Sequence, residues 1–375
     1  MGLRFSTAIL AALLAGGAAQ AATYRLTDLG DLAGGNGSSS ARAINAKGQV
    51  VGDATTASGV THAFLWDPAL GMIDLGDLPG GTDSSSGQGL NDAGQVVGYS
   101  RAETGTRAFV WDAANGMRDL GDLPGGGDYS QALGINAAGT VVGFSFAANA
   151  AGTQRTHGFR WTETGGMEDL NGADDDATNY ARKINDAGQV AGDIELNGQT
   201  VAYRLEADGS RTLIGDLPGG PAYSLAGAIN AQGQMAGVGT VAGGAQHAYF
   251  WDETLGMVDL GDLPGGLDFS IANGLNNKGT VVGVGYTDFG RHAFVWDAVA
   301  GMQDLNGLID ANLGWTLERA IGINDAGQIV GWGTRSDGVS HAYLLTPDVA
   351  PVPLPAGGVL LAGALAGFAA LRRKR

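Results

Sequence analysis

The stretch Leu90–Gly98, which reads Leu-Asn-Asp-Ala-Gly-Gln-Val-Val-Gly, decides the fold because its pattern occurs seven times along the chain. In every copy one glycine follows the asparagine by three residues and a second follows it by seven. Successive copies lie 45 to 49 residues apart. A fixed period of this length is the signature of a repeat array. The asparagines are Asn45, Asn91, Asn136, Asn185, Asn230, Asn276 and Asn324.

Each repeat unit contains four short segments that have the composition of β-strands. In the first unit they are Ser39–Ile44, Gln49–Gly52, His62–Asp67 and Gly71–Gly76. Each is bounded by Gly, Asn, Asp or Pro, which favour turns. Four antiparallel strands repeated about every 46 residues are typical of a propeller blade. The sequence therefore predicts an all-β chain that folds as a seven-bladed β-propeller over residues 22–348.

The two ends of the repeat region complement each other. A copy of the fourth segment lies at Tyr24–Leu32, before the first asparagine, whereas the last unit ends at His341–Leu345 without one. We therefore expect the N-terminal strand to complete the last blade. This closure would remove free sheet edges, which a chain without disulfides needs.

The third segment has a recurrent slot that is followed by a small residue and then Phe or Tyr. This His-Ala-Phe pattern resembles the HAF repeat of bacterial exported proteins, and the resemblance covers essentially all of residues 24–346. It implies an exported repeat protein and carries no secure biochemical activity. The slot residues are His62, Arg107, His157, Val201, His247, His292 and His341.

The first 21 residues predict a secretory signal peptide. Arg4 precedes an apolar run from Ala8 to Ala19, and Ala19-Gln20-Ala21 forms a small-residue cleavage site, with cleavage after Ala21. The alternative is a short buried helix. The signal peptide implies that the secretion translocon handles this chain.

The C-terminus has three parts in a fixed order: Val352-Pro353-Leu354-Pro355-Ala356, the apolar stretch Gly357–Leu371, and a basic tail at 372–375. Fifteen helical residues span about 22 Å, short for a hydrocarbon core of about 30 Å. The positive-inside rule places the tail in the cytoplasm. This ending, residues 349–375, resembles a PEP-CTERM sorting signal of the VPLPA type. That resemblance implies an exosortase partner, transient anchoring in the inner membrane by a transmembrane helix, and release to the cell surface or extracellular matrix. The alternative is a plain C-terminal anchor.

Composition narrows the function classes. The formal net charge is −17, which disfavours nucleic acid and anionic membranes as partners. Cysteine is absent, which excludes disulfides, thiolate metal sites and a cysteine nucleophile. The many aspartates permit weak Ca²⁺ binding without requiring it. Because they lack the ligand alternation of calcium loops, we expect turn aspartates, no metal site and no cofactor.

Segment spacing separates the two ends of the predicted ring. The Asn-x-x-Gly turn and the third-to-fourth strand connection keep constant lengths, and they lie at one end, here called the Asn rim. The other two connections vary in length and lie at the opposite end, here called the variable rim. Loops of variable length usually carry function. The insertions are 144–156, 171–180 and 306–319.

These insertions supply the candidate ligand-binding residues. We expect 144–156 and 171–180 to be neighbours across a blade boundary. The alternative is that all of these side chains simply face solvent. The candidates are Trp315, Tyr180, Arg155, Asp174, Asp175 and Asp176.

Catalytic signals are weak. All five histidines occupy the same repeat slot, which predicts hydrogen-bonding strand residues rather than a shared metal or a catalytic group. The tryptophans that recur in register, such as Trp66, predict packing between blades. No G-x-S-x-G, H-E-x-x-H or phosphate-loop motif occurs, so no catalytic residue is assigned.

Three functions remain open at this point. The favoured interpretation is a non-enzymatic surface or matrix protein that binds a polysaccharide or another protein through the variable rim. A second is a purely structural matrix component. The third is a hydrolase or lyase that acts on exopolysaccharide with single-copy residues of this rim. Fold alone does not decide among them.

Overall fold

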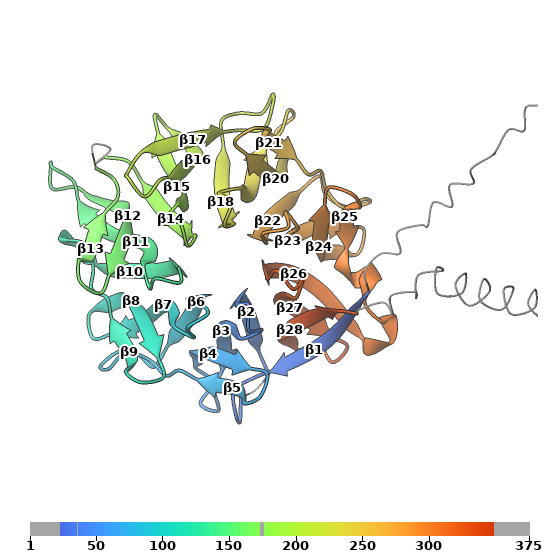
Figure 1. The fold of residues 1–375 in the computed structure, drawn as a ribbon. Helices are drawn as coiled ribbons and strands as arrows, with labels where there is room; N and C mark the ends of the chain where they lie inside the picture. Colours follow the sequence, from blue (N-terminus) through green and yellow to red (C-terminus); the bar gives the residue numbers. More distant parts are fainter. Residues whose placement is uncertain (1–22, 36, 173–175, 349–375) are drawn as a thin grey trace, which may run out of the picture.

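The strands of this chain follow one another around a central axis in a computed structural model (Figure 1). The structure describes residues 23–348 apart from 36 and 173–175. The predicted signal peptide and sorting signal, including the segment 357–371, lie outside the described residues. Within the described part of the chain, no helix has the length and apolar character needed to cross a membrane.

The sheets are built from four consecutive strands, with the last sheet completed by the first strand. Five four-stranded sheets and one eight-stranded sheet are present in the described residues. In the eight-stranded sheet, β6–β9 and β10–β13 are joined by a parallel bridge between Thr106 and Tyr129. The prediction of an all-β chain built from repeated four-stranded units is confirmed.

The strand bounds follow the sequence repeat. The first half of the ring contains β1 (Tyr24–Gly30), β2 (Ser39–Ile44), β3 (Val50–Thr55), β4 (Thr61–Asp67), β5 (Gly71–Asp74), β6 (Ser85–Leu90), β7 (Val96–Ala102), β8 (Gly105–Asp112), β9 (Gly116–Asp119), β10 (Gly125–Ile135), β11 (Val141–Ala148), β12 (Gln154–Thr162) and β13 (Gly166–Asp169). The second half contains β14 (Asn179–Ile184), β15 (Val190–Leu196), β16 (Gln199–Leu205), β17 (Arg211–Gly215), β18 (Ser224–Ile229), β19 (Met235–Thr240), β20 (Gln246–Asp252), β21 (Gly256–Asp259), β22 (Ser270–Leu275), β23 (Val281–Thr287), β24 (Gly290–Asp297), β25 (Gly301–Asp304), the 3-10 turns η1 (Leu305–Leu308) and η2 (Ala311–Leu313), β26 (Trp315–Ile323), β27 (Ile329–Arg335) and β28 (Ser340–Pro347).

Glycine is required at the two repeated positions for different physical reasons. The first, as at Gly48, has φ of +78°, a left-handed conformation that closes the turn. At the second, Gly52, an added Cβ would lie 1.9 Å from the carbonyl oxygen of Ser40 in the neighbouring strand. Only glycine permits this close approach of β3 to β2.

The ring is closed by pairing of the chain ends. Strand β1 runs antiparallel to β28, with Tyr24 opposite Pro347, and β28 continues through β27 to β26. Tyr24 and Leu29 are buried by this pairing. The prediction that the N-terminal strand completes the last four-stranded sheet is confirmed.

Hydrophobic clusters lie between neighbouring sheets. One cluster joins Phe64 of β4 to Val330 of β27 and includes the half-buried Trp66. Another joins Leu65 of β4 to Val96 of β7. The recurrent tryptophans therefore take part in packing between sheets, as the sequence predicts.

Candidate functional site

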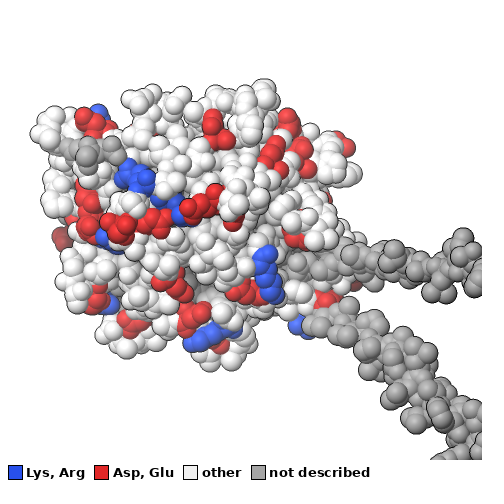
Figure 2. Space-filling view, turned by 45° about the horizontal axis from the view of Figure 1, so that its top comes forward, with Lys and Arg blue, Asp and Glu red and all other residues white. Residues whose placement is uncertain are grey.

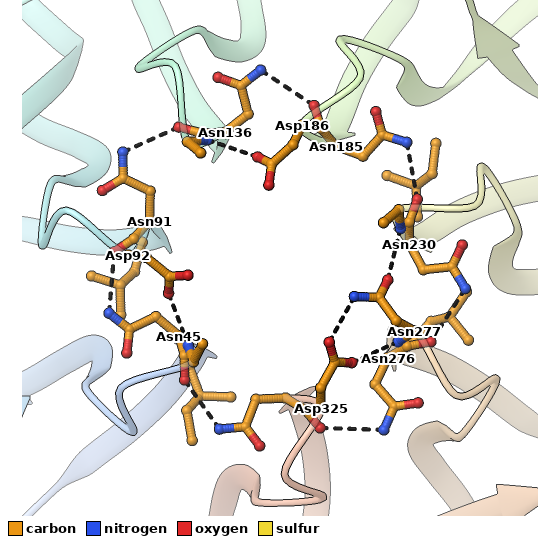
Figure 3. A pocket seen from close by; sticks show the side chains of 18 of the residues that line it. Asn45, Asn91, Asp92, Asn136, Asn185, Asp186, Asn230, Asn276, Asn277 and Asp325 are labelled. Atoms are coloured by element: carbon orange, nitrogen blue, oxygen red, sulfur yellow. Dashed lines mark hydrogen bonds between the residues drawn. The ribbon is translucent and has the colours of Figure 1, made fainter.

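The repeated asparagines form a closed circle around the axis at one end of the ring (Figure 3). Each side-chain amide Nδ2 donates a hydrogen bond to the backbone carbonyl of the next asparagine, and Asn324 donates back to Asn45. The donor–acceptor pairs and distances are Asn45–Asn91 3.1 Å, Asn91–Asn136 3.1 Å, Asn136–Asn185 3.2 Å, Asn185–Asn230 2.9 Å, Asn230–Asn276 3.2 Å, Asn276–Asn324 3.2 Å and Asn324–Asn45 3.0 Å.

The same side chain also closes its own turn. Asn45 Oδ1 accepts hydrogen bonds from the backbone N–H groups of Lys47 and Gln49, and Nδ2 also donates to Gln49 Oε1. The turn geometry was predictable from the sequence, but the circle was not. The available signal was the choice of Asn over Asp in all seven copies, because only the amide can donate a hydrogen bond to the next carbonyl.

A channel runs inward from this circle. Cavities of about 260, 150 and 300 Å³ succeed one another along the axis. The first two share Ile184 in their linings, and the last two share Lys183. The third cavity is lined by earlier residues of the inner strands, such as Gln88 and Leu133, and therefore lies toward the variable rim.

The channel mouth at the Asn rim is acidic. Asp92, Asp186 and Asp325 line the first cavity, one residue after the ring asparagines of their turns (Figure 3). Asp92 accepts a hydrogen bond from the backbone N–H of Ala46 at 2.9 Å, so its carboxylate is fixed toward the neighbouring turn. An anion that approached this mouth would meet three carboxylates.

Four cationic side chains, here called the channel cations, line the two inner cavities: Arg42, Arg182, Lys183 and Arg319. Two have carboxylate partners within the fold. Arg42 pairs with Asp53 at 2.7 Å, and Arg182 pairs with the buried Asp193.

The other two channel cations bind neutral oxygens. Lys183 Nζ donates to the backbone carbonyl of Leu133 at 3.0 Å. Arg319 Nη2 donates to Asn273 Oδ1 at 2.8 Å, while its Nε is buried without a hydrogen-bond partner. Among the described residues, neither forms an ion pair with a carboxylate. The channel therefore carries positive charge that its own walls do not neutralise.

This charge is reflected in the pKa values. Burial lowers the pKa of Lys183 from 10.5 to about 8, and the nearby Arg42 and Arg182 lower it further in the same direction. Burial, followed by repulsion from Arg42 and Arg291, also lowers the pKa of Arg319. Both shifts show that an anion placed here would relieve unfavourable electrostatics.

The structure brings together part of the set of predicted ligand residues. Arg155 Nε donates to the backbone carbonyl of Asp176 at 3.2 Å, which confirms that 144–156 and 171–180 are neighbours. Tyr180 lies beside the same boundary, with its ring 4.9 Å from that of Phe144. Trp315 lies on a different sheet, with its ring 6.5 Å from that of His341. Asp174 and Asp175 fall outside the described residues.

Sequence reasoning missed the channel cations, although a signal for Lys183 existed. Lys183 lies two residues before its asparagine, and the other six units have Ala or Gly at that position. An inner strand that is crowded around an axis favours small side chains. A lysine in that position is therefore the exception that marks the channel.

The histidine slot has the structural role that the sequence predicts. In each of the five cases the imidazole Nδ1 lies within hydrogen-bond distance of an aspartate at the end of the neighbouring outer strand. The constant spacing of 12 residues between slot and aspartate reflects this contact. The pairs are His62–Asp74 2.9 Å, His157–Asp169 2.7 Å, His247–Asp259 2.9 Å, His292–Asp304 2.7 Å and, across the ring closure, His341–Asp28 2.8 Å.

Comparison with known proteins bears on the fold. No family model matches this chain, and no curated protein matches it. It is similar to a solved oligogalacturonate lyase in complex with manganese, with 14% identity and a TM-score of 0.54, over 87% of this chain and 97% of that chain. It is also similar to an oligogalacturonate lyase from Vibrio parahaemolyticus, with 13% identity and a TM-score of 0.53, over 86% and 97% of the two chains. These similarities support a β-propeller-like fold.

Proposed function

We propose that this chain is an exported, non-enzymatic, seven-bladed β-propeller that binds an acidic polysaccharide in its central channel. The circle of seven asparagines supports the blade count, with the eight-stranded sheet counted as two blades. Export rests on the sequence of residues 1–21. Exosortase processing, transient membrane anchoring and release to the cell surface or matrix rest on the sequence of 349–375. Mass spectrometry of the released protein tests this route, and an intact residue 375 would contradict it.

One observation carries the binding proposal: Lys183 and Arg319 line the channel without carboxylate partners in a chain whose net charge is −17. Such charges cost stability unless a ligand pairs with them. Uronate carboxylates would accept charge-assisted hydrogen bonds from both side chains. Gln88 and Asn273 line the same cavity and can hydrogen-bond sugar hydroxyls.

The charge distribution sets the side from which the ligand reaches the channel. The carboxylates of Asp92, Asp186 and Asp325 repel anions at the Asn rim, so the acidic chain must reach the cations from the variable rim. Figure 2 shows acidic side chains in scattered groups on the visible face and basic side chains in fewer places. Because the net charge is −17, the molecule as a whole repels an acidic polysaccharide, and the channel cations that lack carboxylate partners supply a local attraction.

Calorimetric titration with uronic-acid oligosaccharides tests this proposal. We expect saturable binding of one oligosaccharide per protein, weakened by salt, because screening reduces charge attraction. A neutral glucose oligomer of the same length is the control and should give no heat of binding. Equal binding of the neutral oligomer would show that the channel cations do not recognise the ligand.

The pH dependence of binding follows from Lys183. Its pKa of about 8 means that the ammonium loses its proton as the pH rises from 7 to 9. An anionic ligand favours the protonated form, so affinity should fall over this range. Arg42 and Arg182 act on Lys183 and lower its pKa further, and Arg319 lines the same cavity. Titrations at pH 6.5 and 9 should differ about tenfold in affinity, and Lys183→Met should remove the difference.

A lyase is the second candidate function. A lysine whose pKa is lowered to about 8, placed beside an arginine that can hold a carboxylate, has the properties of a general base for proton abstraction next to a carboxylate. The similarity to oligogalacturonate lyases motivates the same acidic substrate. Appearance of an unsaturated, ultraviolet-absorbing product during the titrations, lost in Lys183→Met, would replace the binding proposal with this one.

A further inference from the structure

A repeated loop with two aspartates lies on the variable rim, away from the channel cations. The loop Asp-Leu-Pro-Gly-Gly-x-Asp occurs three times, at 77–83, 122–128 and 262–268. In each copy the two aspartates face the slot residue of the preceding third strand. The slot residues are His62, Arg107 and His247, respectively.

In the copy at 122–128 the space between the aspartates holds a cation that belongs to the chain. Arg107 Nη1 lies 2.5 Å from Asp122 and Nη2 lies 2.7 Å from Asp128. The planar guanidinium thus bridges both carboxylates, as its fork of donors allows. This arrangement shows directly that the loop is built around positive charge.

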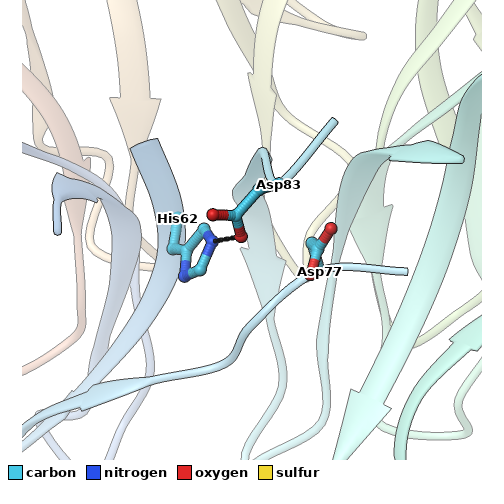
Figure 4. Close-up of side chains that lie close together, drawn as sticks. All are labelled: His62, Asp77 and Asp83. Atoms are coloured by element: carbon cyan, nitrogen blue, oxygen red, sulfur yellow. Dashed lines mark hydrogen bonds and ion pairs between the residues drawn. The ribbon is translucent and has the colours of Figure 1, made fainter. Parts of the chain in front are cut away.

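In the other two copies an imidazole replaces the guanidinium and reaches only one of the two aspartates through a single nitrogen. His62 Nε2 lies 2.8 Å from Asp83, and His247 Nε2 lies 2.6 Å from Asp268. The second carboxylates, Asp77 and Asp262, complete clusters in which the ligand atoms all lie within 4.8 Å of one another (Figure 4).

The other ring nitrogen of each imidazole, Nδ1, already has a carboxylate partner. His62 Nδ1 lies 2.9 Å from Asp74, and His247 Nδ1 lies 2.9 Å from Asp259. With a proton held on Nδ1 by that carboxylate, loss of the Nε2 proton to an incoming cation would direct the Nε2 lone pair toward the two loop aspartates. A carboxylate that holds the distal N–H is the usual outer partner of a metal-binding histidine.

We infer that His62, Asp77 and Asp83 form one divalent-cation site, and that His247, Asp262 and Asp268 form a second. One imidazole nitrogen and two carboxylates form a ligand set for Zn²⁺ or a similar first-row ion, with ligand distances near 2.0–2.2 Å. The remaining coordination positions face the solvent side of the variable rim. The ion does there what the Arg107 guanidinium does between Asp122 and Asp128.

The closing sheet supplies an internal comparison. His341 pairs with Asp28 in the same way, but the loop that follows has Gly37 in the place of the second aspartate. With one loop carboxylate missing, this slot should not hold an ion. The sequence leads to an expectation of no metal site, because the aspartates lack the ligand alternation of calcium loops. These clusters instead combine a strand histidine with two aspartates of the next loop.

Calorimetric titration of the chelator-treated full chain with Zn²⁺ tests the inference. We expect two equivalents to bind, one to each cluster. Asp83→Asn should leave one, and Asp83→Asn combined with Asp268→Asn should leave none, while both asparagines can still hydrogen-bond to the histidines. The matched control is Asp128→Asn, which alters the copy that Arg107 occupies and should leave two. Ca²⁺ should bind more weakly than Zn²⁺, because imidazole is a poor calcium ligand.

A gain-of-site variant makes the test independent of lost stability. Arg107→His should raise the stoichiometry from two to three, because Asp119, Asp122 and Asp128 then surround an imidazole as in the other two copies. Absence of Zn²⁺ binding to the unaltered chain would overturn the inference and leave a protonated imidazole as the cation of each cluster. Zn²⁺ binding that survives in the double variant would overturn it as well.

Discussion

Replacing Lys183 and Arg319 together by methionine is expected to abolish binding of uronic-acid oligosaccharides while leaving the fold at least as stable. Each charge-assisted hydrogen bond contributes about 1.5–3 kcal/mol, so losing two should weaken binding roughly 10²–10⁴-fold. Calorimetric titration measures the affinity of the variant.

The folding stability of the variant should increase, because placing the charges of Lys183 and Arg319 in the channel destabilises the folded state. The pKa of Lys183 falls from 10.5 in the unfolded chain to about 8 in the fold, so folding disfavours its proton. At pH 7 the proton is bound in both states, and the folded state therefore bears the full penalty, which fades as the pH rises above 8. The Lys183 ammonium lines a channel, where solvent screens its charge. We therefore expect this charge to cost about 1–2 kcal/mol of folding stability. Urea unfolding of Lys183→Met should show this gain.

A matched control removes the same charge elsewhere. Lys47 and Lys278 are exposed on the turns of the Asn rim, and changing both to methionine shifts the net charge equally. This variant should bind like the unaltered protein. Equal loss of affinity in both double variants would mean that net charge, and not the channel, governs binding.

Replacing Asn91 by alanine should cost about 2–4 kcal/mol of folding stability. Its side chain makes four hydrogen bonds: Oδ1 accepts from the N–H groups of Ala93 and Gln95, and Nδ2 donates to Gln95 Oε1 and to the carbonyl of Asn136. Each buried hydrogen bond contributes about 1 kcal/mol. Urea and thermal unfolding measure the loss.

Two further variants separate the turn from the circle. Asn91→Asp keeps both acceptor bonds within the turn and removes the donor to Asn136, so it should also destabilise, through the circle and through a buried carboxylate. Asn115 is exposed, its side chain donates hydrogen bonds to Asp112, and its alanine variant should change stability by at most about 0.5 kcal/mol. If Asn91→Ala behaved like Asn115→Ala, the circle would add nothing to the fold.

The sequence was sufficient for the repeat architecture because turn chemistry is local. Positive φ at Gly48, the four strands of each unit and the closure of the ring by the N-terminal strand all follow from periodicity and turn residues. The division into a constant rim and a variable rim followed from loop lengths in the same way.

The site was harder to predict because its residues are distant in the chain and come together only where the inner strands surround the central axis. Lys183 and Arg319 are 136 positions apart in the chain and meet only because their inner strands line the same channel. Loop length directed the prediction to Trp315, Tyr180 and Arg155, whereas the unneutralised charge lies on the inner strands β14 and β26, where the side chains line the channel. The His–Asp–Asp clusters were missed for a similar reason, since the carboxylates come from the loop that leads to the next unit.

The pairing of β1 with β28 also fixes how the molecule would stand on a surface. The backbone N–H of Asp348 donates to the carbonyl of Thr23 at 2.8 Å, so the two ends of the described chain leave the ring side by side. Pro347 is the last residue of β28, which is the third strand of its sheet, and third strands end at the Asn rim. A tether that continues from Asp348 would therefore hold the acidic mouth toward the cell envelope. The variable rim would then face outward, with the channel cations and the histidine loops turned toward whatever approaches from outside.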